Sequence, residues 1–394
     1  MSRELRVGYL SDCDPYDRWA WSGCHFHMAT ALAAAGARVV PLGAALRRTA
    51  SRLGLVLRRV LPAGPAPAAP RNELDEARRW GAAVTDEIAR SRCDVVFAPV
   101  ASHVAAFVEG TTPLVYLSDA TFALLRGFYP ELARLTDDAL ARRDELEART
   151  IARADALLYS SRWAARSAIR DYGASPDAVH VVSFGANLDA APTSDDVRAR
   201  RRAAVCRLLF LGRDWERKGG PIALRTLEAL RARGIAAELV VCGADAPPGP
   251  RPPHVAWLGN LSKRSARDRA RLADELRRAH FLLVPTRADC TPIAFCEAAA
   301  YGLPVVTTET GGVESVVTHG RNGFVLPLDA GADAYASVIA DVWSDDARFA
   351  ALVAASRAEY DARLNWDAWA AIVLRVLAGA AGRGMPVAAS GGAR

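Results

Sequence analysis

The sequence predicts two α/β domains, each built around a doubly wound parallel sheet. Short apolar runs alternate with helix-length segments along most of the chain, which is typical of buried parallel strands joined by crossover helices. This alternation restarts after residue 200, and 394 residues exceed what one hydrophobic core usually holds. We therefore expect one domain over 1–190, a second over 201–360, a crossover helix over 361–378 and a disordered tail over 379–394.

The first set of apolar runs begins close to the N-terminus. The segment 5–10 predicts a strand, and 25–36 predicts a helix that ends at Gly36. Further strands are expected at 37–42, 94–100, 113–118, 155–161 and 178–184. Open parallel sheets bind ligands beyond the carboxyl ends of their strands, so the residues that follow these runs are candidates for a site.

The second set follows a polar stretch, 190–206, that is rich in Arg and Asp and predicts the domain boundary. Its expected strands are 207–212, 238–243, 254–259, 280–285 and 303–308. The Pro- and Gly-rich segments 62–70 and 247–253 predict loops.

Composition narrows the class of protein. A net charge of +6 suits an anionic ligand or a membrane surface. The charge is dispersed and lies beside no aromatic platform, which argues against a nucleic-acid partner. The seven Cys are scattered and form no CxxC pair, so we expect reduced thiols and neither disulfides nor a zinc site. With no signal peptide and no apolar run that could span a bilayer, the sequence predicts a cytoplasmic protein.

One basic residue stands out, because 48 of the 50 Lys and Arg residues are Arg. The two lysines are Lys218 and Lys263, and Lys218 lies in the turn after the strand 207–212, five residues beyond Arg213. A compact ammonium differs from the planar Arg fork, and it suits a point charge placed against a phosphate. The pair therefore predicts a phosphate contact.

A second group of polar residues follows the strand 280–285. Asp289 lies in the loop, and we expect a helix there with Thr291 as its N-cap and Pro292 in its first position. The N-terminus of such a helix binds anions. Glu297 lies eight residues beyond Asp289, inside the helix. Carboxylates beside an anion site would hold hydroxyls, and a sugar nucleotide offers hydroxyls on both sides of a diphosphate.

These two segments resemble the donor-site signatures of glycosyltransferase family 4, the retaining enzymes of GT-B fold. The signature G-R-x4-K-G is met by Gly212, Arg213, Lys218 and Gly219. The signature E-x7-E is met by Asp289-x7-Glu297, with Asp in place of the first Glu. The segments that extend the resemblance over about 5–375 are 21–23, 160–173, 181–189, 297–306, 311–315 and the loop 319–328.

The resemblance implies a role for each matching residue. Arg213 and Lys218 would bind the donor diphosphate and stabilise its charge as the glycosidic bond breaks. Glu297 would hold the ribose hydroxyls, and Asp289 would hydrogen-bond the donor sugar. Backbone N–H groups near Thr291, Pro292 and Ile293 would face sugar and phosphate. Gly23 stands in the segment that corresponds to the Gly-rich loop of the family.

Asp119 is a further candidate, because it follows the strand 113–118 where many family members carry a His. It would stabilise the oxocarbenium-like centre or bind a sugar hydroxyl, and the alternative is a helix N-cap before residues 121–127. Trp19 and Trp21 would shape an acceptor cleft or pack in the core. His25, His27 and His103 are interpreted either as packed or as site residues.

The resemblance implies a hexosyltransferase that uses a UDP- or GDP-sugar in polysaccharide, glycolipid or secondary-metabolite assembly. It would need no metal, because two cations take the place of Mg²⁺, and no cofactor. Its acceptor would be a glycan, a lipid-linked or a small molecule. Two alternatives stay open: a catalytically silent sugar-nucleotide binder, and a phosphorylase whose pyridoxal phosphate would need Lys218 or Lys263.

The segment 45–61 interleaves five Arg with leucine and valine. It fits a surface helix of an Arg-rich protein. It also fits a helix that lies on an anionic bilayer and brings a lipid-linked acceptor to the cleft. The second interpretation would give peripheral contact with the inner face of the plasma membrane.

Overall fold

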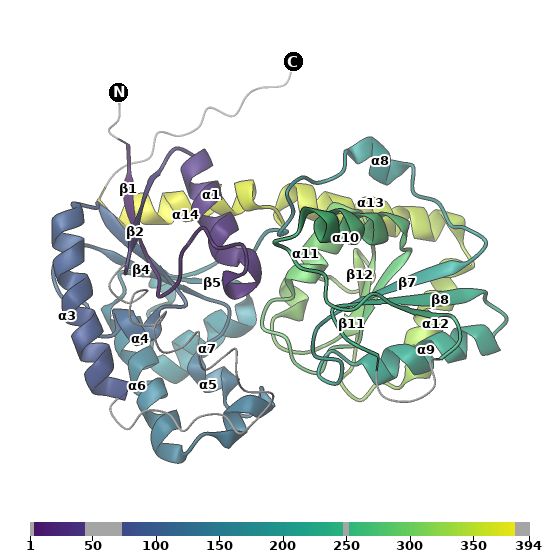
Figure 1. Cartoon of the computed structure of the whole chain (residues 1–394), viewed down its shortest axis with the longest axis horizontal. Helices are drawn as coiled ribbons and strands as arrows, with labels where there is room; N and C mark the ends of the chain where they lie inside the picture. Colours follow the sequence, from purple (N-terminus) through teal and green to yellow (C-terminus); the bar gives the residue numbers. More distant parts are fainter. Residues whose placement is uncertain (1–3, 44–72, 247–251, 383–394) are drawn as a thin grey trace.

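The computed structural model describes residues 4–43, 73–246 and 252–382, and they form two α/β domains that lie side by side (Figure 1). The first sheet contains β1 (Arg6–Leu10), β2 (Arg38–Leu42), β3 (Val95–Pro99), β4 (Leu114–Ser118), β5 (Ala156–Tyr159) and β6 (Val179–Val181). Its strands pair in parallel in the order β2-β1-β3-β4-β5-β6. This confirms the doubly wound sheet that the apolar runs predict.

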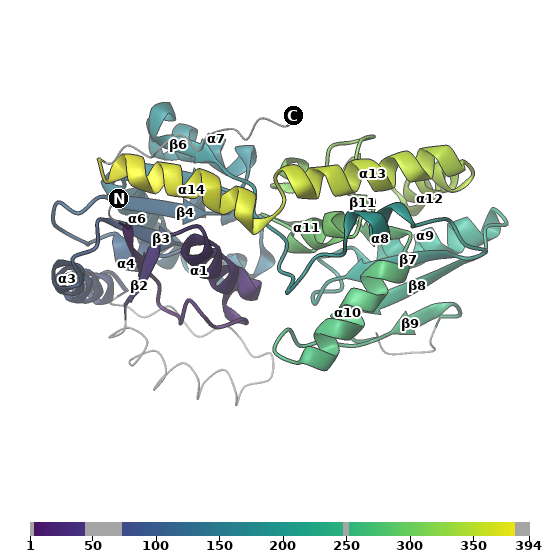
Figure 2. The ribbon, with the colours of Figure 1, turned by 90° about the horizontal axis from the view of Figure 1, so that it is seen from above.

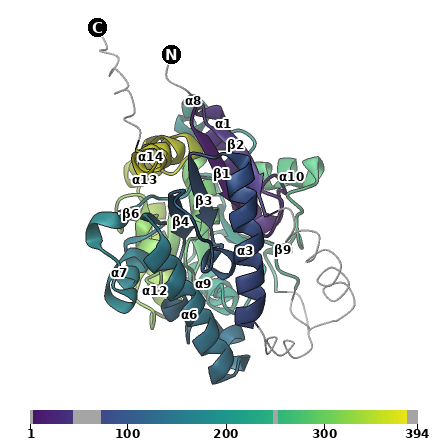
Figure 3. The ribbon, with the colours of Figure 1, turned by 90° about the vertical axis from the view of Figure 1, so that its left-hand side faces the viewer.

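Helices cover both faces of the first sheet (Figure 3). The helices of this domain are α1 (Cys24–Ala34), α3 (Glu73–Ser91), α4 (Ser102–Ala105), α5 (Phe122–Leu125), α6 (Asp137–Arg153) and α7 (Arg162–Tyr172), with 3-10 turns η1 (Ala20–Gly23), η2 (Pro130–Arg134) and η3 (Pro176–Ala178). Local signals fix several ends; Ser161, for example, caps α7 by accepting from the Ala164 N–H at 3.1 Å. Helix α1 packs on one face, and α3, α4, α6 and α7 on the other.

The second domain repeats this plan. Its strands are β7 (Cys206–Leu211), β8 (Ala237–Cys242), β9 (Val255–Trp257), β10 (Phe281–Val284), β11 (Val305–Thr308) and β12 (Gly323–Leu326). They also pair in parallel, in the order β12-β11-β10-β7-β8-β9. Its helices are α8 (Ser194–Arg198), α9 (Gly220–Ala232), α10 (Ala266–Arg278), α11 (Ile293–Ala300), α12 (Ala332–Trp343) and α13 (Asp346–Ala362), with the 3-10 turn η4 (Val313–Ser315).

One strand contradicts the sequence-based prediction, which places a loop over 319–328. Residues Gly323–Leu326 form β12 and pair with β11. The run has only four residues between an Asn and a Pro, so its apolar pattern is too short to separate from a loop. A Cβ on Gly323 would lie 2.2 Å from the Val305 carbonyl oxygen, so this pairing also needs glycine.

The last helix returns to the first domain. Figure 2 shows α13 and then α14 (Trp366–Ala380) running one after the other across the two domains. The crossover helix thus begins later than the expected 361–378, because Asn365 caps it by accepting from the Ala368 N–H at 2.8 Å. Trp369 and Val373 are buried against the first sheet beside α1. The C-terminal segment therefore completes the core of the N-terminal domain.

The two connections between the domains are joined to each other. The Ala186 N–H donates to the Leu364 carbonyl at 3.1 Å, and Trp366 Nε1 donates to Asn187 Oδ1 at 3.0 Å. Gly185 lies so close that an added Cβ would be 2.6 Å from the Trp366 nitrogen. Any hinge motion between the domains must therefore move both connections together.

Several predicted segments lie outside the described residues. They are the Arg-rich segment 45–61, the loop 62–70, residues 247–251 of the loop 247–253, and the part of the tail from 383 onward. Of the described helices, none combines the length and the apolar character that crossing a membrane would require.

Candidate functional site

A cavity of about 410 Å³ lies between the two domains. It is lined from the second domain by loops that follow β7, β9 and β10, and from the first domain by residues near α1 and β4. The predicted site residues that line it are Asp119, Arg213, Lys218, Asp289, Thr291, Pro292, Ile293 and Glu297. Gly23 does not line it, although its neighbours Ser22 and Cys24 do. The structure thus gathers residues that are up to 178 positions apart in the chain.

The turn between β7 and α9 carries the first cation pair. Gly219 precedes α9 with φ of +78°, and a Cβ there would lie 1.9 Å from the Pro285 carbonyl oxygen. Only glycine fits this backbone position, because a side chain would be strained and would also collide with the β10 loop. The close approach holds Lys218, the residue before Gly219, against the loop that carries Asp289.

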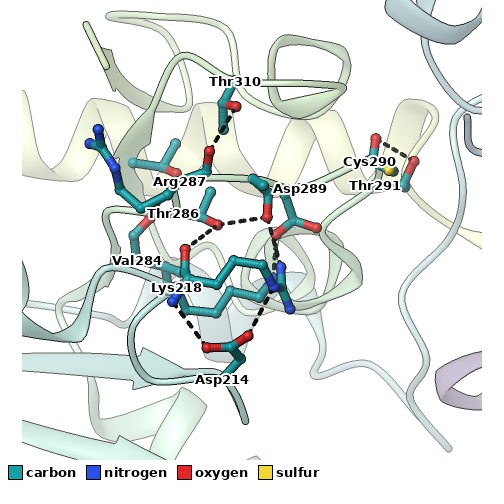
Figure 4. Close-up of polar contacts among 12 residues, drawn as sticks. Asp214, Lys218, Val284, Thr286, Arg287, Asp289, Cys290, Thr291 and Thr310 are labelled. Atoms are coloured by element: carbon teal, nitrogen blue, oxygen red, sulfur yellow. Dashed lines mark hydrogen bonds and ion pairs between the residues drawn. The ribbon is translucent and has the colours of Figure 1, made fainter. Parts of the chain in front are cut away.

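Lys218 forms an ion pair with Asp289, and the two side chains are only 16% and 8% exposed. Figure 4 shows them meeting between the two loops, above the Asp214 side chain. The Asp289 loop is itself held by the Gly-Gly turn, because the Gly312 N–H donates to the Asp289 carbonyl at 3.0 Å. The first predicted cation and the first predicted carboxylate therefore form one buried unit in this structure.

The start of α11 differs from the prediction. Thr291 does not cap the helix; Pro292 takes the N-cap position, and Ile293 is the first helical residue. The Thr291 hydroxyl instead contacts the Ser160 hydroxyl of the first domain at 2.5 Å. It also donates to the Cys290 carbonyl at 2.8 Å (Figure 4). The first turn of the helix still lines the cavity, so its free N–H groups and positive dipole end face any ligand there.

Glu297 is buried on α11 and forms an ion pair with Lys263 at 2.5 Å. Sequence reasoning missed Lys263 as a site residue. The scarcity of lysine that singles out Lys218 applies to Lys263 equally, so the signal was present. Both lysines of the chain line one cavity, and each pairs with one carboxylate of the Asp289-x7-Glu297 motif.

Asp119 is half-buried where β4 ends, and it faces the cavity from the first domain. Burial raises the pKa of its carboxyl to about 7, and the nearby charge of Asp289 adds to the shift. The alternative role as helix cap is not met, because Thr121 occupies the N-cap position of α5. The side chain thus titrates near neutral pH on the wall opposite Lys218.

Aromatic residues join the first-domain wall to the predicted cations. The Arg213 guanidinium lies 4.1 Å from the centre of the Trp19 ring, in cation–π contact. Trp21 packs edge-on against Phe184, and both line the cavity. Two further residues that sequence reasoning missed lie beside them: Tyr129, whose hydroxyl contacts Cys290 Sγ at 3.4 Å, and Arg217, which lies 5.2 Å from the Tyr129 ring.

The three histidines lie outside the lining of the cavity. His25 is buried with its Nδ1 2.9 Å from the Tyr9 hydroxyl, and burial lowers its pKa to about 4. His27 stacks on Trp366, and burial likewise lowers its pKa to about 4. His103 lies 3.4 Å from Asp12. Of the two interpretations, the structure favours packing for His25 and His27.

The cavity carries an excess of positive charge. Its lining contains five basic and three acidic side chains: Arg18, Arg213, Arg217, Lys218, Lys263, Asp119, Asp289 and Glu297. An excess of two positive charges beside a helix N-terminus favours a dianionic group, while the carboxylates supply acceptors for hydroxyls.

Two Rossmann-like domains that face each other across such a site define the class of GT-B proteins.

Comparison with known proteins agrees with this class. Residues 206–345 match the family model described as Glycosyl transferases group 1. A D-inositol 3-phosphate glycosyltransferase of Xylanimonas cellulosilytica is 34% identical over 285 residues, which cover 64% of this chain and 65% of the relative. A second, from Catenulispora acidiphila, is 31% identical over 236 residues, which cover 55% of this chain and 54% of the relative.

The chain thus spans between about half and two thirds of the length of these relatives. The match of residues 206–345 to the glycosyl transferases group 1 model, together with these relatives, confirms the resemblance to glycosyltransferase family 4. Because the relatives carry glycosyltransferase names, the comparison also supports the expectation of a transferase enzyme.

Solved structures extend the likeness to both domains. Sucrose-phosphate synthase from Thermosynechococcus elongatus superposes with a TM-score of 0.67 at 19% identity, covering 95% of this chain and 98% of that one. HepE from Anabaena, solved in complex with UDP, gives 0.64 at 18% identity and covers 95% and 100%. At these identities the likeness concerns the fold alone, and it confirms the expected GT-B architecture.

Proposed function

We propose that this protein transfers a hexose from a nucleoside-diphosphate sugar to an acceptor, with retention of configuration at the transferred carbon. The observation that carries the proposal is the meeting of Lys218 with Asp289, and of Lys263 with Glu297, in one cavity with an excess of positive charge. A diphosphate flanked by two sugars would use both the cations and the carboxylates. The donor would be a UDP- or GDP-sugar, and the UDP complex of HepE supports that class.

Each residue would act through its charge or its hydrogen-bonding groups. Departure of the nucleoside diphosphate builds negative charge, which Arg213, Lys218 and the N-terminus of α11 would stabilise in a site partly closed to water. These groups would take the place of a divalent metal. Glu297 would accept from ribose hydroxyls, and Asp289 would accept from a hydroxyl of the transferred sugar once the diphosphate draws Lys218 away.

Retention would follow from attack on the same face that the leaving group vacates. The leaving phosphate would accept the proton of the acceptor hydroxyl, so the protein would supply no nucleophile. Asp119, on the opposite wall, would stabilise the positive charge that develops on the sugar ring. The acceptor would enter beside Trp19 and Trp21, and it would be a glycan, a lipid-linked or a small molecule.

A panel of sugar nucleotides tests the donor site. We expect a UDP- or GDP-sugar to raise the melting temperature and to give saturation-transfer NMR signals, because binding to the folded state alone stabilises it. Adenosine and cytidine diphosphates are the matched controls. Hydrolysis or transfer should then follow with EDTA present. Donor binding without turnover on any acceptor would indicate a silent binder, and no response to any nucleotide would refute the proposal.

Closure of the cleft is a second expected result. Ion pairs join the two domains beside the cavity: Arg264 donates twice to Asp17 at 2.8 Å, and Asp189, in the connection between the domains, pairs with Arg18 at 2.5 Å and with Arg269 at 2.6 Å. These exposed ion pairs are weak alone, so a ligand that joins the two walls should shift the population toward this closed form. Small-angle scattering should show a smaller radius of gyration with saturating UDP or GDP than without. An unchanged radius would contradict ligand-driven closure.

A further inference from the structure

Arg213 differs from its neighbours in the loop 212–219, because the second domain does not fix its side chain. It is exposed, and its guanidinium forms no hydrogen bond or ion pair with any residue in the described part of the chain. Arg217 is the opposite case, since its Nε donates to Asp214 at 3.2 Å and its Nη1 donates to the Ala288 carbonyl at 2.7 Å. A long side chain without such partners loses more conformational entropy when it must hold a ligand in one geometry.

The backbone at Arg213 is nevertheless held firmly. The Gly212 N–H donates to the Cys242 carbonyl at 3.0 Å. A Cβ on Gly243 would lie 2.8 Å from the Gly212 carbonyl oxygen and 3.3 Å from the Arg213 nitrogen, so the two loops are in close contact. The second domain therefore sets the backbone position of Arg213, and only the direction of its side chain is left open.

The first domain supplies the contact that this side chain lacks. The guanidinium carbon of Arg213 lies over the Trp19 ring, 4.1 Å from its centre, and both residues line the cavity. Tryptophan makes the strongest cation–π contacts of the aromatic side chains. The contact acts through the charge of the guanidinium, so the N–H donors stay available for a diphosphate. The Trp19 ring thus orients Arg213 without occupying the groups that would bind the ligand.

Trp19 is in turn held by a contact between the two domains. Asp17 Oδ1 accepts from the Trp19 N–H at 2.9 Å and from Arg264 Nη2 at 2.8 Å. The guanidinium carbon of Arg264 also lies 5.8 Å from the centre of the Trp19 ring. The ring is therefore in contact with two arginines of the second domain, although Trp19 belongs to the first. Opening of the cleft would separate Trp19 from both.

We infer that Trp19 is a positioning residue for the transfer reaction, because its ring holds the Arg213 guanidinium toward the leaving diphosphate when the cleft is closed. The inference rests on the proposed function, which assigns Arg213 to that diphosphate. The cation site of the second domain is then complete only when the domain that holds the acceptor has arrived. A donor bound to the open form meets a mobile Arg213, so its glycosidic bond is less activated toward water.

A double-mutant cycle on nucleotide binding tests the inference without an acceptor. Isothermal titration with UDP and with GDP would compare the wild type, Trp19→Leu, Arg213→Ala and the variant that carries both changes. Loss of a cation–π contact at an exposed site should weaken binding about threefold in Trp19→Leu. In the Arg213→Ala background the same change should have no further effect, because Trp19 acts through Arg213. Trp19→Phe keeps an aromatic face and should bind nearly as well as the wild type.

Donor hydrolysis separates this role from binding of the acceptor. The substrate is the sugar nucleotide that the donor panel identifies, and water takes the place of the acceptor. Trp19→Leu should lower kcat for hydrolysis about tenfold, because the cation is present but no longer oriented. A residue that served only the acceptor would leave hydrolysis unchanged. Tyr16→Leu is the matched control, since Tyr16 is an exposed aromatic residue of the same segment and lies outside the lining of the cavity; it should equal the wild type in both assays.

The outcomes distinguish the inference from the proposed function. If the wild type binds UDP or GDP but Trp19→Leu weakens binding equally with and without Arg213, the positioning role is refuted and the proposed function stands. Unchanged binding and hydrolysis in Trp19→Leu would refute the role as well. If the wild type binds neither nucleotide, the proposed function fails and the inference fails with it.

Discussion

Replacing Lys218 with alanine should reduce donor use by about a hundredfold or more, because a preorganised charge in a partly closed site contributes strongly to stabilising a leaving diphosphate. The measurement is kcat/KM for hydrolysis or transfer of the donor that the nucleotide panel identifies. The Lys218 side chain is only 16% exposed, so little water can replace the lost ammonium. Glu297→Ala should reduce donor use by a similar factor, because it removes the carboxylate that would hold the ribose hydroxyls.

The variant Lys218→Arg should also be impaired, although it keeps the charge. The stem of Lys218 packs over Gly212, where an added Cβ would lie 2.8 Å from Lys218 Cγ. A planar guanidinium is wider than an ammonium and would be misplaced in this narrow space. Full activity in Lys218→Arg would show that the single lysine in an Arg-rich loop has no functional meaning.

Stability must be separated from activity, because Lys218→Ala leaves Asp289 buried without its ionic partner, which is destabilising. Lys218→Ala/Asp289→Asn removes the unpaired charge, so it should regain melting temperature without regaining donor use. Arg225→Ala, on the exposed side of α9, is the matched control for removing a positive charge from this domain. Recovery of activity in the double variant would contradict a direct role for Lys218.

The architecture was predictable because the strands of parallel sheets have a clear apolar pattern in the sequence. Strands that are buried on both faces read as continuous apolar runs. Of the twelve strands in the described residues, nine lie within the predicted segments, and β7 and β8 begin one residue before theirs. The exception, β12, is a four-residue run whose first residue is Gly323. Its place in the sheet depends on the close approach of the Val305 carbonyl, which is a tertiary contact and leaves no local pattern.

Helix ends were less predictable for the same reason. Thr291 followed by Pro292 has the local signature of a capped helix start, yet the Thr291 hydroxyl turns to Ser160 in the other domain. The contact between Thr291 and Ser160, which are 131 positions apart, therefore replaces the local cap. The crossover helix shows the opposite case, because its true start is marked by Asn365, a residue with a strong capping preference.

The candidate site was predicted as separate motifs, and the structure adds how they pair. Motif spacing placed Lys218, Asp289 and Glu297 near one another, but it assigned cations to phosphate and carboxylates to hydroxyls. In the structure each carboxylate instead holds one lysine. Lys263 follows a short edge strand and belongs to no motif that sequence reasoning used, so its partner became visible only when the fold brought the loop after β9 and the helix α11 to the same cavity.

The last prediction concerns Asp119, whose carboxyl has a pKa raised to about 7 mainly by burial. If its ionised form stabilises the developing positive charge on the sugar, kcat/KM of the wild type should rise as pH increases through about 7. Asp119→Asn should be about a hundredfold less active at pH 8 and should lack this rise. Below pH 6 the two proteins should converge, because the wild-type carboxyl is then neutral as well.

Stability should change in the opposite direction. A carboxyl whose pKa is higher in the folded than in the unfolded state favours folding below its unfolded value and loses that contribution as pH rises through the folded value. The ionised Asp119 thus lowers the stability of the folded state at pH 8. At that pH Asp119→Asn should therefore melt at a higher temperature than the wild type, and the difference should be smaller at pH 5. Asp86→Asn, which is exposed in the middle of α3, should change neither property.

These two readouts together decide the role of Asp119. A lower melting temperature with unchanged turnover would make it a structural residue, despite its place on the cavity wall. A large loss of turnover at every pH, with no convergence below pH 6, would mean that the side chain binds a sugar hydroxyl instead of acting through its charge. Only one result fits a carboxylate that destabilises the fold but stabilises positive charge on the sugar ring. In that result Asp119→Asn loses turnover in a pH-dependent way and has a higher melting temperature than the wild type at pH 8.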